Sequence, residues 1–507
     1  MNIYYFSWFT QQAIAGLVLE DIEDCLAAGG EVLVLFCEGT NLPCWANRYR
    51  SKSICGECKF NRRLFANRLK GDQLHWKSVE SILRDDEIHY PDWQYNSLDD
   101  ILKLEYEGIN VGRGALSTYV SWTRNLHPVM DSDFRLFFGD LLNQQVRLKR
   151  AITLLLSKLG DSVESISMFN SRQADVKPVY EVSRQLGVHT RVIEAVADNP
   201  EYYRREVFEN YRAHDLEMRQ LNIHRAWENT SKTLEQREQL GHRFFQEKRK
   251  GKKLGDLNDH LRFQERGILP KSYDNRKRYI TIFNSSEDEY YAVETTGEIF
   301  AMFSSQLEGM KFIAEQTSKM GYGVYIRIHP HLHSISYSYH TAIAQLAENF
   351  SHVEVIPADS SISSYDLLEI SEKVITFGST IGIEATYWGK PSICLSNLSM
   401  YSLLDAVYFP RSKEELILLM KNPVEGKSIL GCLKYGNYIM DIDSYTLPSK
   451  ASPKEVRILG KLIFYVFPYL RIQGSKILYV LYVSIRFRIW DIFIAKFRPR
   501  IIPIKGY

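Results

Sequence analysis

Several short polar segments in the second half of the chain directly follow apolar runs rich in β-branched and aromatic residues. Asn284-Ser285-Ser286 follows RYITIF, His329-Pro330 follows GVYIRI, and Gly378-Ser379-Thr380 follows KVITF. The runs predict strands, and open α/β sheets bind ligands at the carboxyl ends of their strands. These polar groups, together with Arg327, therefore predict a ligand site, although His329 alone could be a packed core histidine.

The segment TFGSTIGIEA opens a predicted helix and has a direct chemical interpretation. Ser379 and Thr380 can cap the helix, whose first backbone N–H groups would offer a phosphate site. Gly378 and Gly382 let the backbone approach a ligand closely, and a carboxylate at Glu384 suits the two hydroxyls of a ribose. In the structural alternative, Ser379 only caps the helix and Glu384 interacts with the helix dipole.

Four of the seven cysteines lie close together in FCEGTNLPCWANRYRSKSICGECKFNRR. Cys55 and Cys58 form a C-x-x-C pair, and Cys37 and Cys44 precede it. Such a cluster is typical of a tetrahedral structural zinc site, so we expect a metal that staples a loop and no cofactor for catalysis. The irregular first spacing leaves a buried thiol at a strand end as the alternative for Cys37.

The elements that position these residues alternate between apolar β-rich runs and helical patterns. In the first half, strands are expected at 31–37, 165–170 and 187–195, with a helix at 178–186. In the second half, strands are expected at 278–286, 321–330, 353–361, 373–380 and 391–395, with a helix at 299–317. The alternation predicts the α/β class, with a parallel sheet and crossover helices in each of two Rossmann-like domains.

Length and composition set the domain boundaries. A chain of 507 residues is too long for one ordinary core, and its 45% hydrophobic and 24% charged residues are typical of a globular protein. We expect an amino-terminal domain at 1–200, a charged helical connector at 201–270, a second domain at 271–455 and a tail at 456–507. The basic run EKRKGKK in the connector predicts a solvated helix face, with a specific anion site as the alternative.

The tail differs in charge from the rest of the chain. Its basic residues far outnumber its one acidic residue, Asp491, whereas the whole chain has a net charge of +2. Basic residues mixed with aromatic ones predict amphipathic helices on an anionic membrane surface rather than a nucleic-acid-binding core. The alternative is a terminal helix that packs back onto the first domain.

Targeting signals are not apparent in the sequence. The start, MNIYYFSWFTQQ, lacks the basic region and cleavage site of a signal peptide. The chain also has no apolar run of about 18 residues, the length that spans a bilayer. Seven cysteines without a secretory signal favour a reducing compartment. We therefore expect a cytoplasmic protein that lies peripherally on the inner face of the cell membrane.

The motifs of the second half together resemble the capsular polysaccharide biosynthesis glycosyltransferases. The matching residues are RIHP, then PADSSISSYDLLEISEKVITFGSTIGIEATYWGKPSI, and upstream QERGILPKSYDNRKRYITIFNSSEDEY. The shared pattern is an HP pair, an S-x-Y-D-L helix start, S-T-x-G-x-E-A and a later G-K-P. The resemblance covers residues 263–395 and is similar in outline to bacterial Kdo transferases and, more distantly, to wall teichoic acid polymerases. It implies the GT-B architecture, in which two Rossmann-like domains with parallel sheets face a cleft.

The resemblance also implies a nucleotide-sugar donor bound in the second domain. The implied donor residues are His329, Ser379 and Thr380 at the phosphate, Glu384 at the ribose, Ser363, Ser364 and Tyr365 beside the base, Ser285 and Ser286 facing the cleft, and Arg327 and Gly382 completing the set. No residues mark the sugar, so a CMP-, UDP- or GDP-linked donor fits equally well.

The first domain is expected to bind the acceptor and to supply the catalytic base. By resemblance, Asn170, Arg172 and Glu194 in MFNSRQADVKPVYEVSRQLGVHTRVIEA line the cleft, although Ser171 stands where glycine is common. Candidate bases are Glu107, Asp131 and Asp133, by location only. For all these residues, the alternative is an ordinary βα turn with helix caps.

Together these features predict a glycosyltransferase that moves a sugar from a nucleotide donor to a cell-surface polysaccharide or lipid-linked acceptor. His329 would stabilise the departing nucleotide. One alternative is a teichoic-acid-type polyol-phosphate transferase, for which CDP-alditol donors would be the test. Another is a non-catalytic scaffold of a capsule assembly complex, and a nucleotide-sugar epimerase is a third.

Overall fold

The chain forms two compact α/β units. The computed structural model describes residues 1–40, 43–69, 71–83, 88–126, 128–197, 203–213, 215–228, 230–252, 264–286, 302–332, 338–397, 399–401 and 403–449. The first unit comprises Met1–Asp215 and the described residues from Thr446 onward, and the second comprises Leu216–Tyr445. Each unit has a largely parallel sheet with helices between its strands, which confirms the expected α/β class with two Rossmann-like domains. The predicted amphipathic tail at 456–507 lies outside the described residues.

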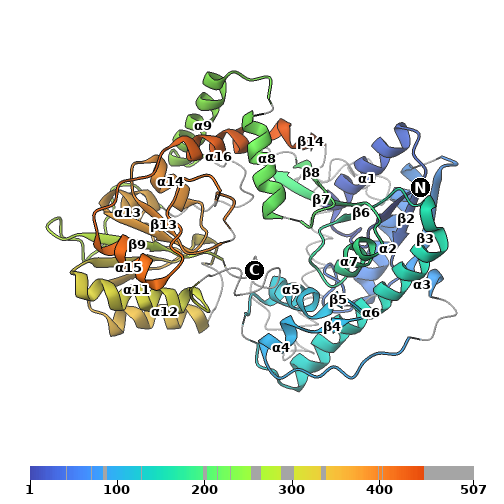
Figure 1. Cartoon of the computed structure of the whole chain (residues 1–507). Coiled ribbons are helices and arrows are strands. Elements are labelled where there is room, and N and C mark those ends of the chain that lie inside the picture. The colour runs from blue at the N-terminus through green and yellow to red at the C-terminus, as the bar shows by residue number, and fades with distance from the viewer. Residues whose placement is uncertain are drawn as a thin grey trace, which may run out of the picture. The chain divides into compact units, whose positions relative to one another are not determined.

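The first unit is built on a seven-stranded sheet in the order β14-β8-β7-β6-β1-β2-β3 (Figure 1). Its strands are β1 (Asn2–Tyr5), β2 (Val32–Phe36), β3 (Leu74–Ser78), β6 (Ser165–Phe169), β7 (Thr190–Ala197), β8 (Tyr203–Glu209) and β14 (Thr446–Pro448). The pairs β7–β8 and β8–β14 are antiparallel and the others are parallel. Every residue of β2 and β6 is buried, as expected of parallel strands covered on both faces.

Helices cover both faces of this sheet. They are α1 (Gln12–Ala27), α2 (Lys52–Arg68), α3 (Val79–Ile82), α4 (Leu98–Leu102), α5 (Val111–Thr123), α6 (Ser132–Leu159) and α7 (Lys177–Gln185), with a short hairpin of β4 (Glu105–Tyr106) and β5 (Ile109–Asn110) before α5. Right-handed crossovers place α1, after β1, and α7, after β6, on opposite faces. The long α6 packs against α7 and so covers the same face.

A buried ionic cluster ties α1 to the strands β7 and β8. The carboxylate of Asp21, which is 4% exposed, accepts hydrogen bonds from the Tyr4 hydroxyl at 2.8 Å and from Arg191 at 2.6 Å. Arg205 adds a third contact to Asp21 at 3.3 Å. A buried carboxylate with this many partners avoids most of the cost of an unpaired charge.

The second unit is built on a five-stranded sheet in the order β11-β10-β9-β12-β13. Its strands are β9 (Tyr279–Phe283), β10 (Gly323–Arg327), β11 (Val353–Ile356), β12 (Lys373–Thr376) and β13 (Ser392–Cys394), and every neighbouring pair is parallel. All five lie within the ranges that the sequence predicts. The first strand in the chain, β9, is therefore the central strand of the sheet, with β10 on one side and β12 on the other.

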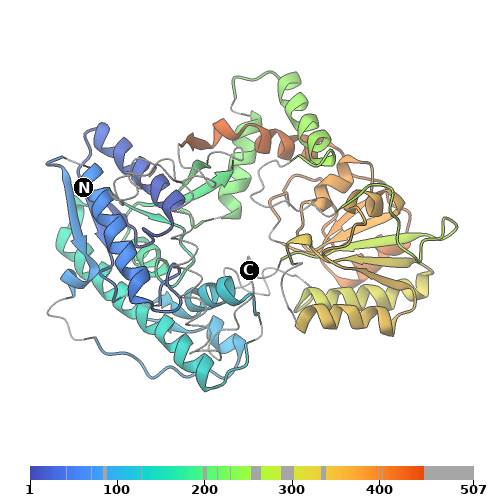
Figure 2. The same cartoon turned by 180° about the vertical axis from the view of Figure 1, so that it is seen from behind.

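Two hydrophobic cores cover the faces of this sheet. The helices of the unit are α8 (Leu216–Glu228), α9 (Leu234–Arg249), α11 (Gln306–Met320), α12 (Ser338–Asn349), α13 (Ser364–Ile370), α14 (Ile381–Tyr387), α15 (Lys413–Lys421) and α16 (Leu430–Met440). Side chains of α11, α12 and α15 form one core, and side chains of α13 and α14 form the other. Figure 2 shows the same arrangement, with α11 and α12 on the face opposite α13 and α14.

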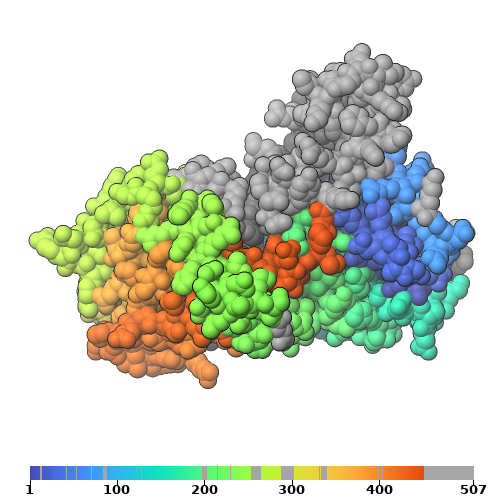
Figure 3. All heavy atoms as spheres, turned by 90° about the horizontal axis from the view of Figure 1, so that it is seen from above, coloured from blue at the N-terminus to red at the C-terminus, as the bar shows by residue number. Residues whose placement is uncertain are grey.

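The helices α8, α9 and α16 pack together on the second unit, and Figure 3 shows their green and orange-red surfaces side by side. Phe244 and Phe245 of α9 are buried, and so is Ile223 of α8. At Gly241 a Cβ atom would lie 2.7 Å from the carbonyl oxygen of Leu433, so α9 and α16 need a glycine at their crossing.

The predicted connector at 201–270 is therefore not a separate element. Its first part is β8, which pairs with β7 in the first unit, and its helices α8 and α9 belong to the second unit. The boundaries expected at 200, 270 and 455 move to 215 and 445, because the charged helices also carry apolar faces that need a core. Among the residues that the structure describes, no helix is long and apolar enough to cross a bilayer.

We expect Gly241→Ala to lower the free energy of unfolding by about 1–3 kcal/mol, because the added methyl group forces α9 away from α16. Chemical denaturation followed by circular dichroism measures the change. Gly139→Ala in α6 is the control, since no atom lies within 4 Å of its added Cβ, and it should stabilise the helix by roughly 0.5–1 kcal/mol. Equal effects of the two substitutions would contradict the packing described for Gly241.

Candidate functional site

The three central strands of the second unit end in register with one another at their carboxyl ends. Phe283 of β9 is in register with Arg327 of β10 on one side and with Thr376 of β12 on the other. The chain leaves β9 toward β10 and reaches β12 only later, so the connections diverge on either side of β9. This topological switch point is where open α/β sheets form ligand-binding crevices.

The loop after β9 holds the ends of the neighbouring strands together. The Asn284 side chain, 1% exposed, accepts a hydrogen bond from the backbone N–H of His329 at 2.6 Å. The Ser285 hydroxyl donates to the carbonyl of Phe377 at 2.8 Å. The buried side chain of Gln306, the first residue of α11, accepts from the Ser285 backbone N–H at 2.9 Å. Asn284 and Ser285 are thus the links from β9 to β10 and β12.

The loop after β12 lies against the same residues. Gly378 has a φ of +101°, and a Cβ atom there would lie 3.3 Å from Cβ of Ser396 and 3.9 Å from the Ser285 hydroxyl. Neither hydroxyl that follows it caps α14: Thr380, the N-cap residue, instead donates to Glu384 at 3.4 Å. Ser379 is half-buried, and its backbone carbonyl accepts a hydrogen bond from the Tyr401 hydroxyl at 2.6 Å. The purely structural role of a helix cap is therefore not seen for Ser379.

Two predicted site residues lie at the end of β10 (Arg327) and just after it (His329), and their surroundings differ. His329 is half-buried and is held at the switch point through its backbone bond to Asn284. Arg327 is 1% exposed and donates to the carbonyls of Pro357 at 2.5 Å and Ser360 at 3.3 Å. Burial lowers the pKa of the Arg327 guanidinium to about 10, and nearby Asp359 partly opposes this shift. Arg327 therefore braces the loop between β11 and α13.

Glu384, predicted at a ribose, is buried within the unit. One carboxylate oxygen accepts a hydrogen bond from the Tyr365 hydroxyl at 2.5 Å, and the other lies 3.6 Å from the ammonium group of Lys248 on α9. Burial and the adjacent Glu384 charge raise the pKa of Tyr365 well above its usual range. Glu384 thus joins α9, α13 and α14, and a ribose would have to share these partners.

The residues predicted to lie beside the nucleobase of the donor are at the start of α13. Ser363 caps this helix by accepting from the Tyr365 N–H at 3.2 Å, and the Ser364 N–H donates to the side chain of Gln264 at 2.7 Å. The guanidinium groups of Arg249 and Arg266 lie 5.8 Å and 5.9 Å from the centre of the Tyr365 ring, and both form ion pairs with Glu369. Arg266 also pairs with Asp366, so carboxylates of α13 balance both cations, and Ser363, Ser364 and Tyr365 are themselves buried.

One buried hydrogen-bond donor at the switch point is unused among the described residues. The Asn284 amide nitrogen is buried and has no hydrogen-bond partner among the described residues. The hydroxyl of Ser379 and the half-buried His329 lie on the loops that Asn284 and Ser285 tie together. An unused buried donor is costly unless a ligand or water accepts from it. The arrangement can therefore bind a group rich in acceptor oxygens, such as a phosphate.

The residues predicted to face an acceptor lie at the carboxyl edge of the first unit's sheet. Asn170 follows β6 with a φ of 57°, and its side chain accepts from the Arg172 N–H at 2.9 Å. The Ser171 hydroxyl accepts from the Ala213 N–H at 2.9 Å, so it anchors a second loop. Glu194, on β7 beside Glu206 of β8, is 6% exposed. Asn170 and Ser171 thus have structural partners of the kind that an ordinary βα turn provides.

The three candidate bases, Glu107, Asp131 and Asp133, have local partners or helix positions of their own. Glu107 forms an ion pair with Lys149, which holds the pKa of Glu107 below its usual range, and the adjacent Gly108 is bound by Gln185 at the end of α7. Asp131 is the exposed N-cap of α6 and accepts from the Phe134 N–H at 2.8 Å. Asp133 lies in the first turn of the same helix. These contacts are those of ordinary helix caps and surface pairs.

Sequence reasoning missed Asp175, a carboxylate that does lie at this edge. It is 1% exposed and accepts from the Trp8 indole at 2.5 Å and the Trp45 backbone N–H at 3.1 Å. Its second oxygen has no hydrogen-bond partner among the described residues. Burial raises the pKa of Asp175 to about 6, although these hydrogen bonds oppose the shift. Its position shortly after β6 was the available signal, because polar residues at strand ends are where sites form.

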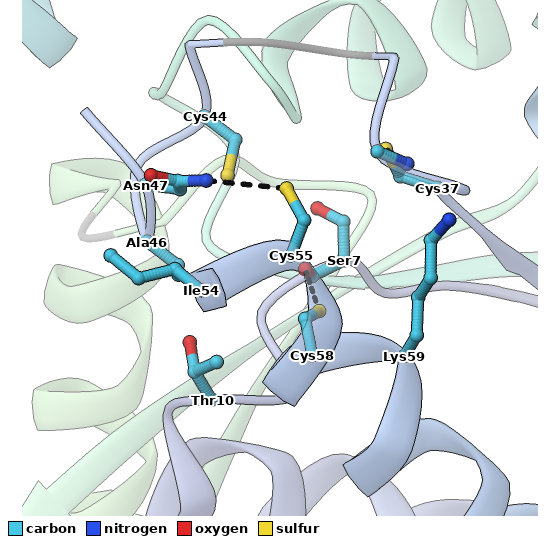
Figure 4. Close-up of a pocket in the computed structure, with 11 residues that line it drawn as sticks. Ser7, Thr10, Cys37, Cys44, Ala46, Asn47, Ile54, Cys55, Cys58 and Lys59 are labelled. Carbon is cyan, nitrogen blue, oxygen red and sulfur yellow. Dashed lines mark hydrogen bonds between the residues drawn. The ribbon is translucent and has the colours of Figure 1, made fainter. Parts of the chain in front are cut away.

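The four clustered cysteines line one pocket of the first unit (Figure 4). Burial raises the pKa of Cys44 well above its usual range and that of Cys58 to about 11, which favours thiols over thiolates. In the described parts of the chain, no three His, Cys, Asp or Glu side chains are arranged as metal ligands. The side chains as placed do not form a zinc site, and zinc at Cys37, Cys44, Cys55 and Cys58 stays a prediction from the sequence.

The two units and the switch-point site define a doubly wound α/β protein with a candidate anion-binding crevice. No protein-family model and no curated protein matches the chain. Similar solved structures include the beta Kdo 2,4 transferase KpsC of Thermosulfurimonas dismutans, at 14% identity over 54% of this chain and 79% of that chain, with a TM-score of 0.33.

Two further structures are similar to a comparable degree. The beta Kdo 2,7 transferase KpsC of the same organism is 13% identical over 62% of this chain and 89% of that chain, with a TM-score of 0.33. The UDP-GlcNAc 2-epimerase of Methanocaldococcus jannaschii, in complex with UDP-GlcNAc and UDP, is 10% identical over 88% and 100%, with a TM-score of 0.25. At these identities and TM-scores, the comparisons give the chain neither a family nor an activity.

The raised pKa of Asp175 predicts a pH-dependent stability. The folded chain holds the Asp175 proton more tightly than the unfolded chain does. The contribution of this proton to the free energy of unfolding is therefore full below about pH 4 and is lost as the pH rises through about 6. The loss should reach about 3 kcal/mol by pH 7. Asp175→Asn removes the titration and keeps an acceptor for Trp8 and Trp45.

Denaturant unfolding of both proteins at several pH values measures this effect. We expect the stability of Asp175→Asn relative to the unsubstituted chain to increase between pH 4 and pH 7, with the steepest change at about pH 5, midway between the unfolded and folded pKa values of Asp175. A difference between the two proteins that does not change with pH would contradict the buried, proton-holding position of Asp175.

Proposed function

We propose that the chain is a glycosyltransferase that binds a nucleotide sugar at the carboxyl edge of the second unit's sheet. The observation that carries this proposal is the switch point, where Asn284 and Ser285 tie the ends of β9, β10 and β12 together. This leaves the Asn284 amide nitrogen without a partner among the described residues. The half-buried Ser379, in the loop after β12, offers a hydroxyl as a second donor. A diphosphate supplies the acceptor oxygens that these donors need.

The proposed reaction is displacement of the nucleotide at the anomeric carbon by an acceptor hydroxyl. Negative charge then grows on the diphosphate as the bond to the sugar breaks. Donors fixed in position before the reaction stabilise such charge without reorganising. Asn284 and Ser379 are held by the fold in this way, and His329 would add a third donor when protonated.

The sugar-transferring part of the proposal rests on sequence motifs. The HP pair at His329-Pro330 and the segment from Gly378 to Glu384 carry the resemblance to capsular polysaccharide glycosyltransferases. In support, these motifs follow β10 and β12, the two strands on either side of β9. A cell-surface polysaccharide or a lipid-linked saccharide is the proposed acceptor.

We expect one nucleotide among CMP, CDP, UDP and GDP to raise the thermal unfolding temperature of the purified chain. Saturation at about 100 times the dissociation constant corresponds to about 2.7 kcal/mol of stabilisation. Ser379→Ala should weaken binding of that nucleotide about tenfold or more, since a hydrogen bond to a charged phosphate is lost. Differential scanning fluorimetry and calorimetric titration measure both effects.

The matched control is Ser351→Ala, which removes an exposed hydroxyl just before β11, at the opposite edge of the same sheet. It should bind the nucleotide as the unsubstituted chain does. If Ser379→Ala and Ser351→Ala bind equally well, the proposed position of the phosphate is wrong. If no nucleotide stabilises the chain, the transferase proposal fails and a scaffold role is favoured. Stabilisation by CDP with turnover of CDP-alditols alone would favour polyol-phosphate transfer.

A lipid-linked acceptor requires contact with a membrane, which we propose is made by the basic, aromatic tail. The tail residues Arg486 and Arg488 flank Phe487 and precede Trp490 in the sequence. Basic residues near an anionic bilayer contribute about 1 kcal/mol each. The chain should therefore bind vesicles that contain anionic lipid, and binding should weaken as salt is added.

We expect the double substitution Arg486→Glu and Arg488→Glu to reduce binding to anionic vesicles at least tenfold, because charge attraction becomes repulsion. Vesicle flotation measures the bound fraction. Arg276→Glu with Lys277→Glu, on the exposed turn before β9, makes the same change of net charge and is the control. Equal binding of all three proteins would show that the tail does not make the contact.

A further inference from the structure

The thiol pocket of the first unit lies at the carboxyl edge of its sheet. It encloses a cavity of about 20 Å³, enough for about one water molecule. The pocket is lined by Ser7 after β1, Cys37 after β2, Cys44 and Asn47 from the following loop, and Cys55 and Cys58 from α2. Segments distant in the sequence thus bring four thiols around one small space (Figure 4).

Two of the four sulfur atoms are held by the backbone. Cys58 Sγ donates to the carbonyl of Ser7 at 3.3 Å, which directs it toward the end of β1. Cys37 Sγ accepts from the Gly39 N–H at 3.0 Å, within its own loop. These contacts keep Cys37 and Cys58 in fixed positions in the lining of the pocket (Figure 4).

The other two sulfur atoms, those of Cys44 and Cys55, point toward each other (Figure 4). Asn47 fixes this pair from both sides. Its backbone N–H donates to the Cys44 carbonyl at 2.8 Å, and its side-chain amide donates to Cys55 Sγ at 3.2 Å. Ser51 caps α2, and Cys55 follows in the helix's first turns. Cys55 Sγ thus accepts a hydrogen bond near a helix amino terminus, which is the geometry of an attacking sulfur, whereas Cys44 lies on the loop.

We propose that this pocket is an oxidative modification site at which Cys44 and Cys55 form a disulfide with a low-molecular-weight disulfide as the oxidant. The Cys55 thiolate attacks one sulfur of the oxidant, a new S–S bond forms, and one small thiolate leaves. Cys44 then loses its proton and attacks Cys55 Sγ, which releases the second small thiolate. The two cysteines are oxidised, and one small disulfide is reduced to two thiols.

The crosslink would act on the centre of the first unit. Cys44 precedes Trp45, whose backbone N–H binds Asp175 and whose ring lies 5.0 Å from that of Trp8. A Cys44–Cys55 bond joins this loop to α2 and restricts the movement of Trp45 over Asp175. Oxidation would therefore hold Trp45 in place over the buried carboxylate of Asp175.

The test is incubation of the full chain with glutathione disulfide, followed by thiol counting and peptide mass spectrometry. We expect the unsubstituted chain to lose two of its seven thiols and to yield a crosslink between Cys44 and Cys55. Cys44→Ser should instead keep one glutathione on Cys55, because the resolving thiol is gone. Cys55→Ser should form neither the crosslink nor that adduct.

Cys58→Ser and Cys25→Ser are the controls. Cys25 lies in α1, outside the pocket, so both variants should form the Cys44–Cys55 crosslink as the unsubstituted chain does. A crosslink between Cys55 and Cys58, or equal thiol loss in Cys44→Ser, would overturn the proposal. Unreactive thiols together with one tightly held zinc per chain would also overturn it and support the zinc site. Thermal unfolding of each variant establishes that it is folded.

Discussion

The hydrogen bonds that Asn284 and Ser285 make beyond the end of β9 are the constraint on which the second unit's site depends. Without them, the loops after β10 and β12 would be joined to β9 only by the strand pairing that stops at Phe283. With them, the backbone of His329 and the carbonyl of Phe377 are fixed to one central loop. Gly378 can then pass close to Ser396 because it has no side chain. These hydrogen bonds thus fix the positions of the loops after β9, β10 and β12 without a bound ligand.

The first unit uses its equivalent edge differently. Its strand ends are covered by aromatic rings and thiols, and its most notable group there is Asp175, a carboxylate covered by Trp8 and Trp45. Burial of a carboxylate with few partners favours its protonated form, which is why its pKa rises. In the described residues, the second unit has an unused donor, the Asn284 amide, at its switch point, whereas the first holds a shielded acid beside four thiols. The two sheets share the order of five parallel strands, but the residues at their carboxyl edges differ in chemistry.

Most of the strands could be predicted from the sequence, and so could the polar residues that follow the strands of the second unit. Runs such as YITIF and GVYIR are apolar and β-branched, so β9 and β10 and the polar residues that follow them were recognisable. The strand β8, YRREVFE, was missed because its charges hide a strand that pairs at the antiparallel side of the sheet. The helices α8 and α9 were assigned to a connector because charged residues surround the few that are buried, such as Phe244 and Phe245.

Partners distant in the sequence could not be predicted. The bond from Asn284 to the His329 N–H spans 45 positions, and the bond from the Tyr365 hydroxyl to Glu384 spans 19. No local pattern specifies either bond, although the four residues were singled out. Asp175 left no signal in the periodicity because its environment is made by Trp8 and Trp45, from two other loops.

Photoaffinity labelling tests the central claim most directly, which is that nucleotide binds at the carboxyl edge of the second unit's sheet. The full chain would be irradiated with a photoreactive nucleoside diphosphate, and the labelled peptides would be identified by mass spectrometry. The account predicts labelling in the peptides around Asn284, Tyr365 and Ser379, removed by excess unlabelled nucleotide. Labelling confined to residues of the first unit, or labelling that excess nucleotide does not reduce, would contradict it.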